Sequence, residues 1–225
     1  MVVLPKFPPG RVLSWTRVML AIYRRRARAH ALLGPCLGLL AFASVSCAKP
    51  FLVANFETVY RPRTNSFALA PIANLSTEPE GAKAGAAIRE AIYYELSQRQ
   101  DQYTVQLQDI AVTDQKLRAA GISDSSAARL PGPDLAKLLG VDAVMRGSVT
   151  RYKKKGAGGQ IVTAVLFGFA SGSEVKADVA IYDGADGRMI WQHNIDKAGG
   201  MFSSPDALRN SVGRDIAKKF PYRKP

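Results

Sequence analysis

Two runs of alternating apolar and polar residues, separated by a glycine-containing turn, constrain the fold of this chain most strongly. They form the stretch 174–195, EVKADVAIYDGADGRMIWQHNI, with the turn at 183–187. Side chains of a strand point alternately to its two faces, so this pattern predicts a half-buried antiparallel hairpin. The predicted apolar face holds Val175, Ala177, Val179, Ile181, Met189, Trp191, His193 and Ile195.

The register of this hairpin follows from how its strands close on the turn. With Tyr182 opposite Arg188, Val179 is expected to face Trp191 across the two strands. Trp191 is then predicted to be a structural anchor of the core. His193 lies on the same face near a strand end, where a packed histidine is a better interpretation than a catalytic base.

Positive charge is concentrated at the start of the chain. The 225 residues carry a formal net charge of +13, but residues 1–46 hold seven basic residues and no acidic one. The remainder has 24 basic and 18 acidic residues, a net charge of +6. More than half of the basic excess therefore belongs to a leader, and targeting explains it better than nucleic-acid binding.

The leader 1–46 has the pattern of a secretory signal peptide. Four arginines within 24–28 precede the apolar segment ALLGPCLGLLAFASVS and Cys47. This apolar segment is shorter than the roughly 20 residues of a membrane-spanning helix. Met19 is an alternative start that leaves a leader of ordinary length.

Cys47 is the predicted lipidation site. Ala43-Ser44-Val45-Ser46-Cys47 resembles the lipobox of bacterial lipoproteins, although Ser stands where Leu is usual; plain cleavage after Ala43 is the alternative. Once the leader has left with Cys36, Cys47 is the one remaining thiol of an exported protein, and lipidation accounts for it. Lys49 and Pro50 follow without an Asp at position 48, which favours an outer-membrane anchor facing the periplasm.

The mature chain is predicted to be one α/β (α+β) domain, a single mixed sheet of about five to six strands packed by helices. Residues 47–66 are expected to be the lipidated cysteine with a tether that has some packed aromatic residues, and 67–225 the folded domain. Strands are expected at 67–72, 103–107, 141–152 and in the hairpin, and helices at 81–99, 114–120 (with Thr113 as N-cap), 133–139 and from Pro205 (with Ser204 as N-cap). The apolar stretch 161–172 is open to three interpretations: strand, buried helix or flap.

The sequence predicts no enzyme, no metal site and no cofactor. After the leader it has one histidine and one cysteine, too few ligands for zinc, and no nucleophile motif or phosphate-binding glycine loop. Asp183 and Asp186 in the turn lack the ligand spacing of a calcium loop.

Two groups of basic residues are the candidate interaction surface. Their members are Arg151, Lys153, Lys154 and Lys155, then Lys218, Lys219, Arg223 and Lys224. Either they only keep the surface soluble, or they contact an acidic partner, lipid headgroups or an anionic wall polymer.

Two stretches carry a resemblance to a known family. The runs LLGVDAVMRGSV (138–149) and AIYDGADGRMIW (180–191) are similar to bacterial envelope lipoproteins with a TolB amino-terminal-like α/β domain. That group includes LpoB activators of peptidoglycan synthases and the curli secretion subunit CsgG. The resemblance covers roughly 67–220 and implies a non-enzymatic adaptor that binds other envelope proteins.

Together these features predict an outer-membrane-anchored periplasmic lipoprotein that serves as an envelope assembly or adaptor module. One alternative is an activator of a peptidoglycan synthase, and another is a secretion-pore subunit in which 161–172 enters the membrane or packs between protomers. The expected partners are the membrane through the lipid anchor, envelope proteins such as a cell-wall synthase, an anionic polymer or further copies of the chain. Nucleic acid is not among them.

Overall fold

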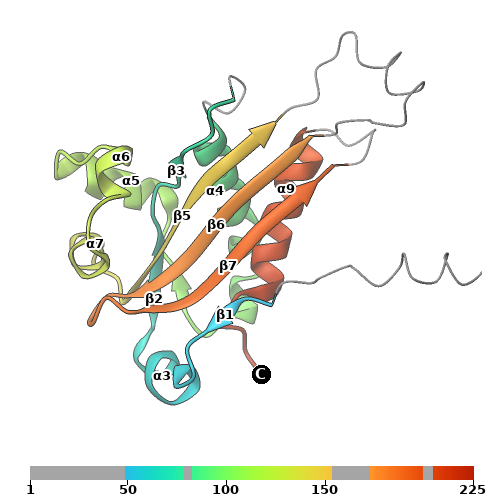
Figure 1. Ribbon diagram of the computed structural model, residues 1–225. Helices are drawn as coiled ribbons and strands as arrows, with labels where there is room; N and C mark the ends of the chain where they lie inside the picture. The colour runs from blue at the N-terminus through green and yellow to red at the C-terminus, as the bar shows by residue number, and fades with distance from the viewer. Residues whose placement is uncertain (1–48, 79–82, 154–172, 200–204) are drawn as a thin grey trace, which may run out of the picture. The chain divides into compact units, whose positions relative to one another are not determined.

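A single mixed sheet forms the centre of the protein, seen here in a computed structural model (Figure 1). The structure describes residues 49–78, 83–153, 173–199 and 205–225. The strands are β1 (Phe51–Leu52), β2 (Ser66–Leu69), β3 (Ala73–Asn74), β4 (Gln106–Leu107), β5 (Ala143–Lys153), β6 (Glu174–Asp183) and β7 (Met189–Ala198). Their order is β1-β7-β6-β5-β2-β4, with β3 also paired to β5. Parallel pairing joins β2 to β4 and β5, whereas β5, β6, β7 and β1 pair antiparallel.

The predicted α/β class is confirmed, but the sheet has seven strands among the described residues and not five to six. One added strand, β1, comes from the expected tether. The other is β3, which follows the predicted strand 67–72 directly; β2 ends at Leu69, and both β2 and β3 are parallel to β5. The break between β2 and β3 contains Pro71, which has no N–H to give to a ladder.

The hairpin of β6 and β7 is confirmed, while its predicted register is wrong by two residues. Trp191 pairs with Ile181, and Val179 pairs with His193. The strands close one residue later than expected, since Asp183 N donates to Arg188 O at 3.0 Å. An irregularity between Ile181 and Tyr182 then shifts the pairing register by a second residue. From Trp191 to Ile195 the shift is even, so these side chains keep their predicted faces. Met189 does not, because it pairs with Tyr182 and Ile190 takes its expected place in the main core.

Two long helices cover one face of the sheet. They are α4 (Ala84–Ser97) and α9 (Pro205–Lys219), which lie side by side behind β5–β7 in Figure 1. Their apolar stripes meet the inward side chains of the sheet in the main core, where Trp191 is 1% exposed. The stripe residues are Ile88, Ile92 and Leu96 on α4 and Leu208, Val212, Ile216 and the following Phe220 on α9.

Three shorter helices cover part of the opposite face. They are α5 (Ile110–Ala119), α6 (Asp124–Ala127) and α7 (Gly132–Leu139), and they enclose a second core with Ala68 and Val144. The helix α5 begins earlier than predicted: Asp109 is its N-cap and accepts from Ala111 N, while Thr113 is buried inside the helix. Gly140 ends α7 in the left-handed conformation, as expected.

The segment expected to be a tether is folded. Residues 56–60 form a π-helical turn, η1 (Phe56–Tyr60), followed by α3 (Arg61–Arg63). Phe56 and Tyr60 are 1% and 2% exposed, so they belong to the core. Because both aromatic side chains are buried, the folded unit begins at β1 and not at Phe67.

Several predictions lie outside the described residues. These are the leader 1–46, Cys47, Lys154, Lys155, the apolar stretch 161–172 and the Ser204 N-cap. Along the described ranges, no helix has both the length and the apolar character needed to cross a membrane.

Candidate functional site

The face of β5–β7 that is turned away from α4 and α9 is largely uncovered. Among the helices that the structure describes, only α6 and α7 lie over part of it. This surface, called the open face, lies opposite α4 and α9 and faces the viewer in Figure 1. Its side chains alternate with the core residues of the same strands, so the hydrophobic pattern of the hairpin directs them outward. The open face consists of Arg146, Ser148, Arg151, Lys153, Glu174, Lys176, Asp178, Ala180, Gln192 and Asn194.

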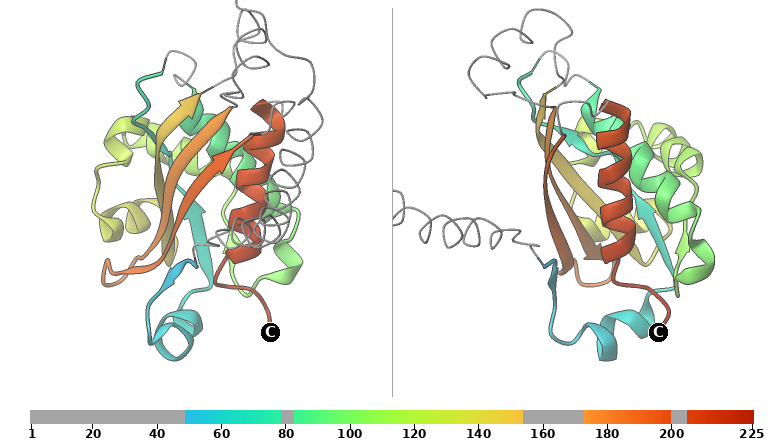
Figure 2. Two further views of the ribbon diagram at one scale, coloured as in Figure 1. Left: turned by 45° about the vertical axis from the view of Figure 1, so that its right-hand side comes forward. Right: turned by 90° about the vertical axis from the view of Figure 1, so that its right-hand side faces the viewer.

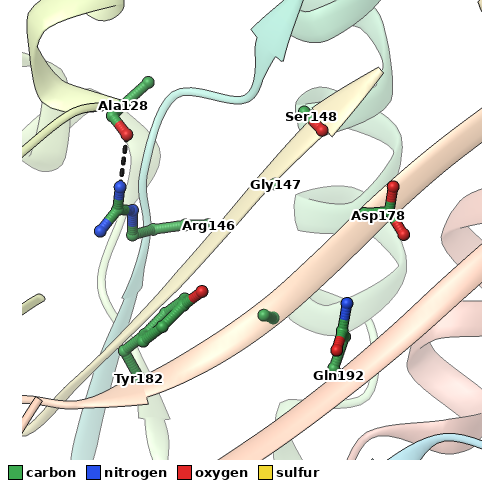
Figure 3. Close-up of a pocket in the computed structure, with 8 residues that line it drawn as sticks. Ala128, Arg146, Gly147, Ser148, Asp178, Tyr182 and Gln192 are labelled. Atoms are coloured by element: carbon green, nitrogen blue, oxygen red, sulfur yellow. Dashed lines mark hydrogen bonds between the residues drawn. The ribbon is translucent and has the colours of Figure 1, made fainter. Parts of the chain in front are cut away.

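A shallow pocket of about 200 Å³ lies on the open face (Figure 3). Its hollow arises at Ala180, whose short side chain pairs across the strands with Arg146 on one side and Gln192 on the other. Arg146 holds the chain after α6 in place, because it donates to Leu130 O at 2.7 Å and to Ala128 O. The guanidinium also lies 5.4 Å from the ring centroid of Tyr182. The pocket is therefore prebuilt on rigid strands.

Asp178 lies at the centre of the open face. It is paired with Ser148 on β5 and with Asn194 on β7, and it lines the pocket. No lysine or arginine within the described ranges forms an ion pair with it. A partly exposed carboxylate between two neutral polar side chains is suited to accept hydrogen bonds from a partner.

A β-bulge places Arg151 and Lys153, the described members of the first predicted basic group, at the upper end of the open face. The register shifts between Val149 and Arg151, which leaves Thr150 as the extra residue. Arg151 therefore shares the open face with Lys176, while Tyr152 turns toward the core. Arg151 pairs with Glu174 at 3.4 Å.

Lys176 completes this charged row. Its Nζ lies 2.9 Å from Asp196 and 3.4 Å from Glu174. The hydrogen bond from Lys176 to Asp196 and the charge of that carboxylate raise the pKa of Lys176. The upper end of the open face is therefore a mixed-charge surface and not a purely basic one.

The second predicted basic group lies at the other end of the sheet, so the structure does not bring the two groups together (Figure 1). Lys218 is exposed in the last turn of α9, and Arg223 and Lys224 are exposed after its end. Lys219 is directed away from them into an ion pair with Asp215 at 3.3 Å.

The chain end is packed against the N-terminal turn in a contact here called the tail junction. Arg61 donates to Pro221 O and Arg223 O, both at 2.8 Å. Tyr222 OH donates to Thr64 Oγ1 at 3.1 Å, and its ring lies 5.1 Å from Phe56. Burial of Tyr222 raises the pKa of its phenol, which keeps the group neutral as a donor. The folded tether and the C-terminal tail thus form one surface.

His193 has a partner that the sequence did not reveal. Its Nε2 lies 2.9 Å from Asp215 Oδ2 of α9, and Lys219 Nζ lies 3.2 Å from the same nitrogen. Burial alone would raise the pKa of Asp215. The His193 hydrogen bond and the charges of Lys197 and Lys219 outweigh this effect, so the pKa of Asp215 is lowered. The His193 side chain is only 2% exposed. A general base must reach the proton that it removes, so this group serves to fasten α9 to β7.

The turn of the hairpin holds a second ionic group, of which Asp183 is buried while Arg63 and Asp186 are partly exposed. Arg63 Nη2 lies 2.8 Å from both Asp183 and Asp186, and its guanidinium covers the ring of Tyr60 at 4.5 Å. Asp183 also accepts from the backbone of the turn. Both carboxylates are thus used by the protein itself. Among the described residues, no cluster of three or more His, Cys, Asp or Glu side chains is arranged to hold a metal ion.

Comparisons with known proteins support the fold. No protein-family model matches the chain. No curated protein matches it in sequence. Among solved structures, lipoprotein GNA1162 from Neisseria meningitidis is 19% identical with a TM-score of 0.51, and the match covers 68% of this chain and 96% of that one. At this identity the similarity shows a shared fold.

Two further solved structures are similar at lower scores. The PelC dodecamer from Paraburkholderia phytofirmans is 15% identical with a TM-score of 0.45, covering 72% of this chain and 91% of that one. The LpoB C-terminal domain from Salmonella enterica is 10% identical with a TM-score of 0.41, covering 61% and 84% respectively. The narrower resemblance to TolB amino-terminal-like and CsgG-like domains stays a prediction.

Proposed function

We propose that this protein is a non-catalytic envelope lipoprotein, anchored through Cys47 in the outer membrane, that binds another envelope protein through the open face. The observation that carries the proposal is the open face itself. Three long strands present a polar surface with a pocket and a carboxylate, Asp178, that has no ion-pair partner among the described residues, on a sheet whose reverse packs against the main core. Such a preorganised surface suits protein recognition because little of it needs to be ordered on binding.

The leader and the fold support the envelope location. Seven basic residues, an apolar segment and the lipobox-like run before Cys47 form a consistent export signal. The solved structure that shares the fold with a TM-score of 0.51 is described as a lipoprotein. Both lines are independent of the open face.

Metabolic labelling with a radiolabelled or clickable fatty acid tests the anchor. We expect label on the wild type and none on Cys47→Ala, with both forms produced in comparable amount. Cleavage after Ala43 by ordinary signal peptidase gives a secreted, unlabelled protein. Equal labelling of the two forms would refute the anchor.

Photocrosslinking in intact cells tests the binding surface and identifies the partner. A photoreactive side chain in place of Gln192, which lines the pocket, is expected to capture an envelope protein. The matched control replaces Tyr94, which is 61% exposed on α4. Capture of a cell-wall synthase assigns the protein as an activator, and capture of further copies of the chain assigns it to an assembly such as a secretion pore. Equal capture from both positions contradicts a role of the open face.

A further inference from the structure

Exposed apolar side chains gather in the first segment of the folded unit. Within the described ranges, six large hydrophobic residues are exposed, and three of them lie between 51 and 59. Phe51 is 48% exposed, Leu52 43% and Val59 39%. Exposed apolar side chains are ordinary when scattered, but a group of them at one end of a domain indicates a contact surface.

Basic residues predominate in the same segment and in the C-terminal tail. The segment 49–65 and the tail 218–224 hold seven basic residues and one acidic residue, Glu57. Glu57 is already paired with Arg61 at 2.7 Å. The basic residues are Lys49, Arg61, Arg63, Lys218, Lys219, Arg223 and Lys224. Outside the two segments, Asp183 and Asp186 pair with Arg63, and Asp215 pairs with Lys219. Among the described residues, the basic side chains of this set without an ion pair are Lys49, Lys218, Arg223 and Lys224.

The structure brings the two segments to one end of the domain. The Arg61 bonds of the tail junction join them, and both Figures 1 and 2 place β1, α3 and the C-terminus at the same end of the sheet. This surface, called here the basic end, consists of 49–63 and 218–224. The sequence alone separates its parts by more than 150 residues.

The basic end is also the part of the domain that follows Cys47 most closely. Phe51 is four residues after Cys47. Even a fully extended chain spans at most about 3.5 Å per residue, so four residues reach roughly 14 Å. A lipid on Cys47 would therefore keep the basic end within a headgroup layer's distance of the bilayer.

We infer that the basic end is a membrane-docking surface for anionic phospholipid headgroups, with Phe51 and Leu52 reaching the interface from the two faces of the edge strand β1. The orientation of the domain relies on the proposed anchor, whereas the lipid contact itself does not. Exposed apolar side chains and basic side chains at the same end of the domain match an anionic lipid surface, which offers negative charge above a hydrocarbon layer. A purely acidic partner protein would use the charges and leave Phe51 and Leu52 exposed.

Docking at the basic end has a consequence for the open face. The strands β5–β7 extend between this end and the opposite end of the domain, with β6 antiparallel to the other two (Figure 2). A domain held at its basic end would thus direct the open face away from the bilayer plane, where it is accessible to a partner. The charged row at Arg151 and Glu174 would then lie farthest from the membrane.

Vesicle sedimentation tests the inference without the lipid anchor. The unit 48–225 holds both hydrophobic cores, so it is expected to fold without residues 1–47, as a circular dichroism melt can verify. We expect it to bind vesicles of phosphatidylethanolamine with phosphatidylglycerol, and to bind vesicles of phosphatidylcholine alone far more weakly. Because a basic residue near an anionic surface changes affinity by roughly fivefold, neutralising both Lys218→Gln and Lys224→Gln should weaken binding by roughly 25-fold.

Matched variants separate docking from general charge and stability. The double variant Arg118→Gln with Lys137→Gln removes the same charge from exposed sites on α5 and α7 and should leave vesicle binding unchanged. Phe51→Ser should weaken binding by about tenfold, whereas Leu75→Ser, at a residue 61% exposed elsewhere, should not.

Three results would overturn the inference. They are no binding to anionic vesicles, equal losses in the test and control variants, and equal binding to soluble polyglutamate with no dependence on Phe51. The last result assigns the basic end to an acidic macromolecule. Fatty-acid labelling of Cys47 is read separately, so loss of the anchor proposal and loss of the docking surface are distinguishable.

Discussion

Arg61 Nη1 donates a 2.8 Å hydrogen bond to the backbone carbonyl oxygen of Arg223, across 162 residues of sequence. A second bond of the same length from Nη2 reaches Pro221 O. A guanidinium is suited to this role because its donors are fixed in a planar fork and always charged. The contact binds the start of the folded unit to its end, and it builds the basic end from both.

The first prediction concerns this junction. Arg61→Gln should lower the free energy of unfolding by about 1–3 kcal/mol, since two hydrogen bonds from a charged donor are lost and two carbonyls lose a partner. Urea denaturation at neutral pH measures the change. Arg209→Gln is the control, because Arg209 makes only a surface ion pair of 3.5 Å with Asp206. Its loss should stay within about 0.5 kcal/mol, and an equal loss in both variants would contradict a special role of Arg61.

The second prediction concerns the contact of the two long helices. A Cβ on Gly213 would lie 2.3 Å from the carbonyl oxygen of Ala91 in α4. Glycine is the poorest helix former apart from proline, so alanine should gain about 1 kcal/mol from propensity. The steric overlap with a backbone atom should outweigh this gain, and we expect Gly213→Ala to destabilise the protein by about 1–3 kcal/mol.

A neighbouring position isolates the propensity effect. Asn210 is exposed on the same helix, so Asn210→Ala should be neutral or slightly stabilising. The melting temperatures of both variants, read by circular dichroism, make the comparison. If Gly213→Ala melts at or above the wild-type temperature, the helices can separate at little cost and the packing argument is wrong.

Much of the fold could be predicted from local patterns. Alternation fixed the two faces of the hairpin, and the i, i+4 stripe of Leu208, Val212 and Ile216 predicted the buried side of α9. The register could not be predicted, because one residue in the turn and one irregularity in β7 change the pairing, and the irregularity also puts Ile190 in the core instead of Met189. The helical turn in the tether could not be predicted, because Phe56 and Tyr60 lie in a single π-helical turn that is too short to show a hydrophobic period.

The third prediction follows from the group that joins β7 to α9. The folded-state pKa of Asp215 is lowered: burial opposes ionisation, but the His193 hydrogen bond and the charges of Lys197 and Lys219 outweigh it. A carboxyl with a lowered folded pKa binds fewer protons when folded. It contributes stability above its unfolded pKa of about 4, and this stability is lost as the pH falls through the folded value.

Asp215→Asn should therefore cost about 1–2 kcal/mol of unfolding free energy near pH 7, and the difference from the wild type should shrink below about pH 4. Urea denaturation at both pH values measures it. Asp206→Asn, at a side chain that is 77% exposed, should change stability little at either pH. A difference that stays constant from neutral to acidic pH would show that Asp215 acts through packing and not through its charge.

The candidate surfaces were less predictable than the fold because they depend on tertiary placement. The sequence identifies two basic groups but not that they lie at opposite ends of the sheet. Nor does it show that a bulge at Thr150 turns Arg151 onto the open face. Asp215 is 22 residues from His193, and no local spacing connects a strand residue with a helix residue at that separation. By contrast, Phe51 and Leu52 are readable as apolar, but their exposure depends on β1 being an edge strand.

The fourth prediction tests the open face at its centre. Asp178 has no ion-pair partner within the described ranges and lies between Ser148 and Asn194, so the fold does not rely on its charge. Asp178→Lys should change the free energy of unfolding by no more than about 0.5 kcal/mol. If a partner donates hydrogen bonds to this carboxylate, reversal of its charge should reduce crosslinking from position 192 by tenfold or more, at roughly 1.4 kcal/mol per factor of ten. Glu90→Lys reverses the charge of an exposed residue on α4 and should leave the crosslink intact. An undiminished crosslink in a correctly folded Asp178→Lys protein would remove Asp178 from the recognition surface, whereas equal losses in both variants would trace the effect to net charge.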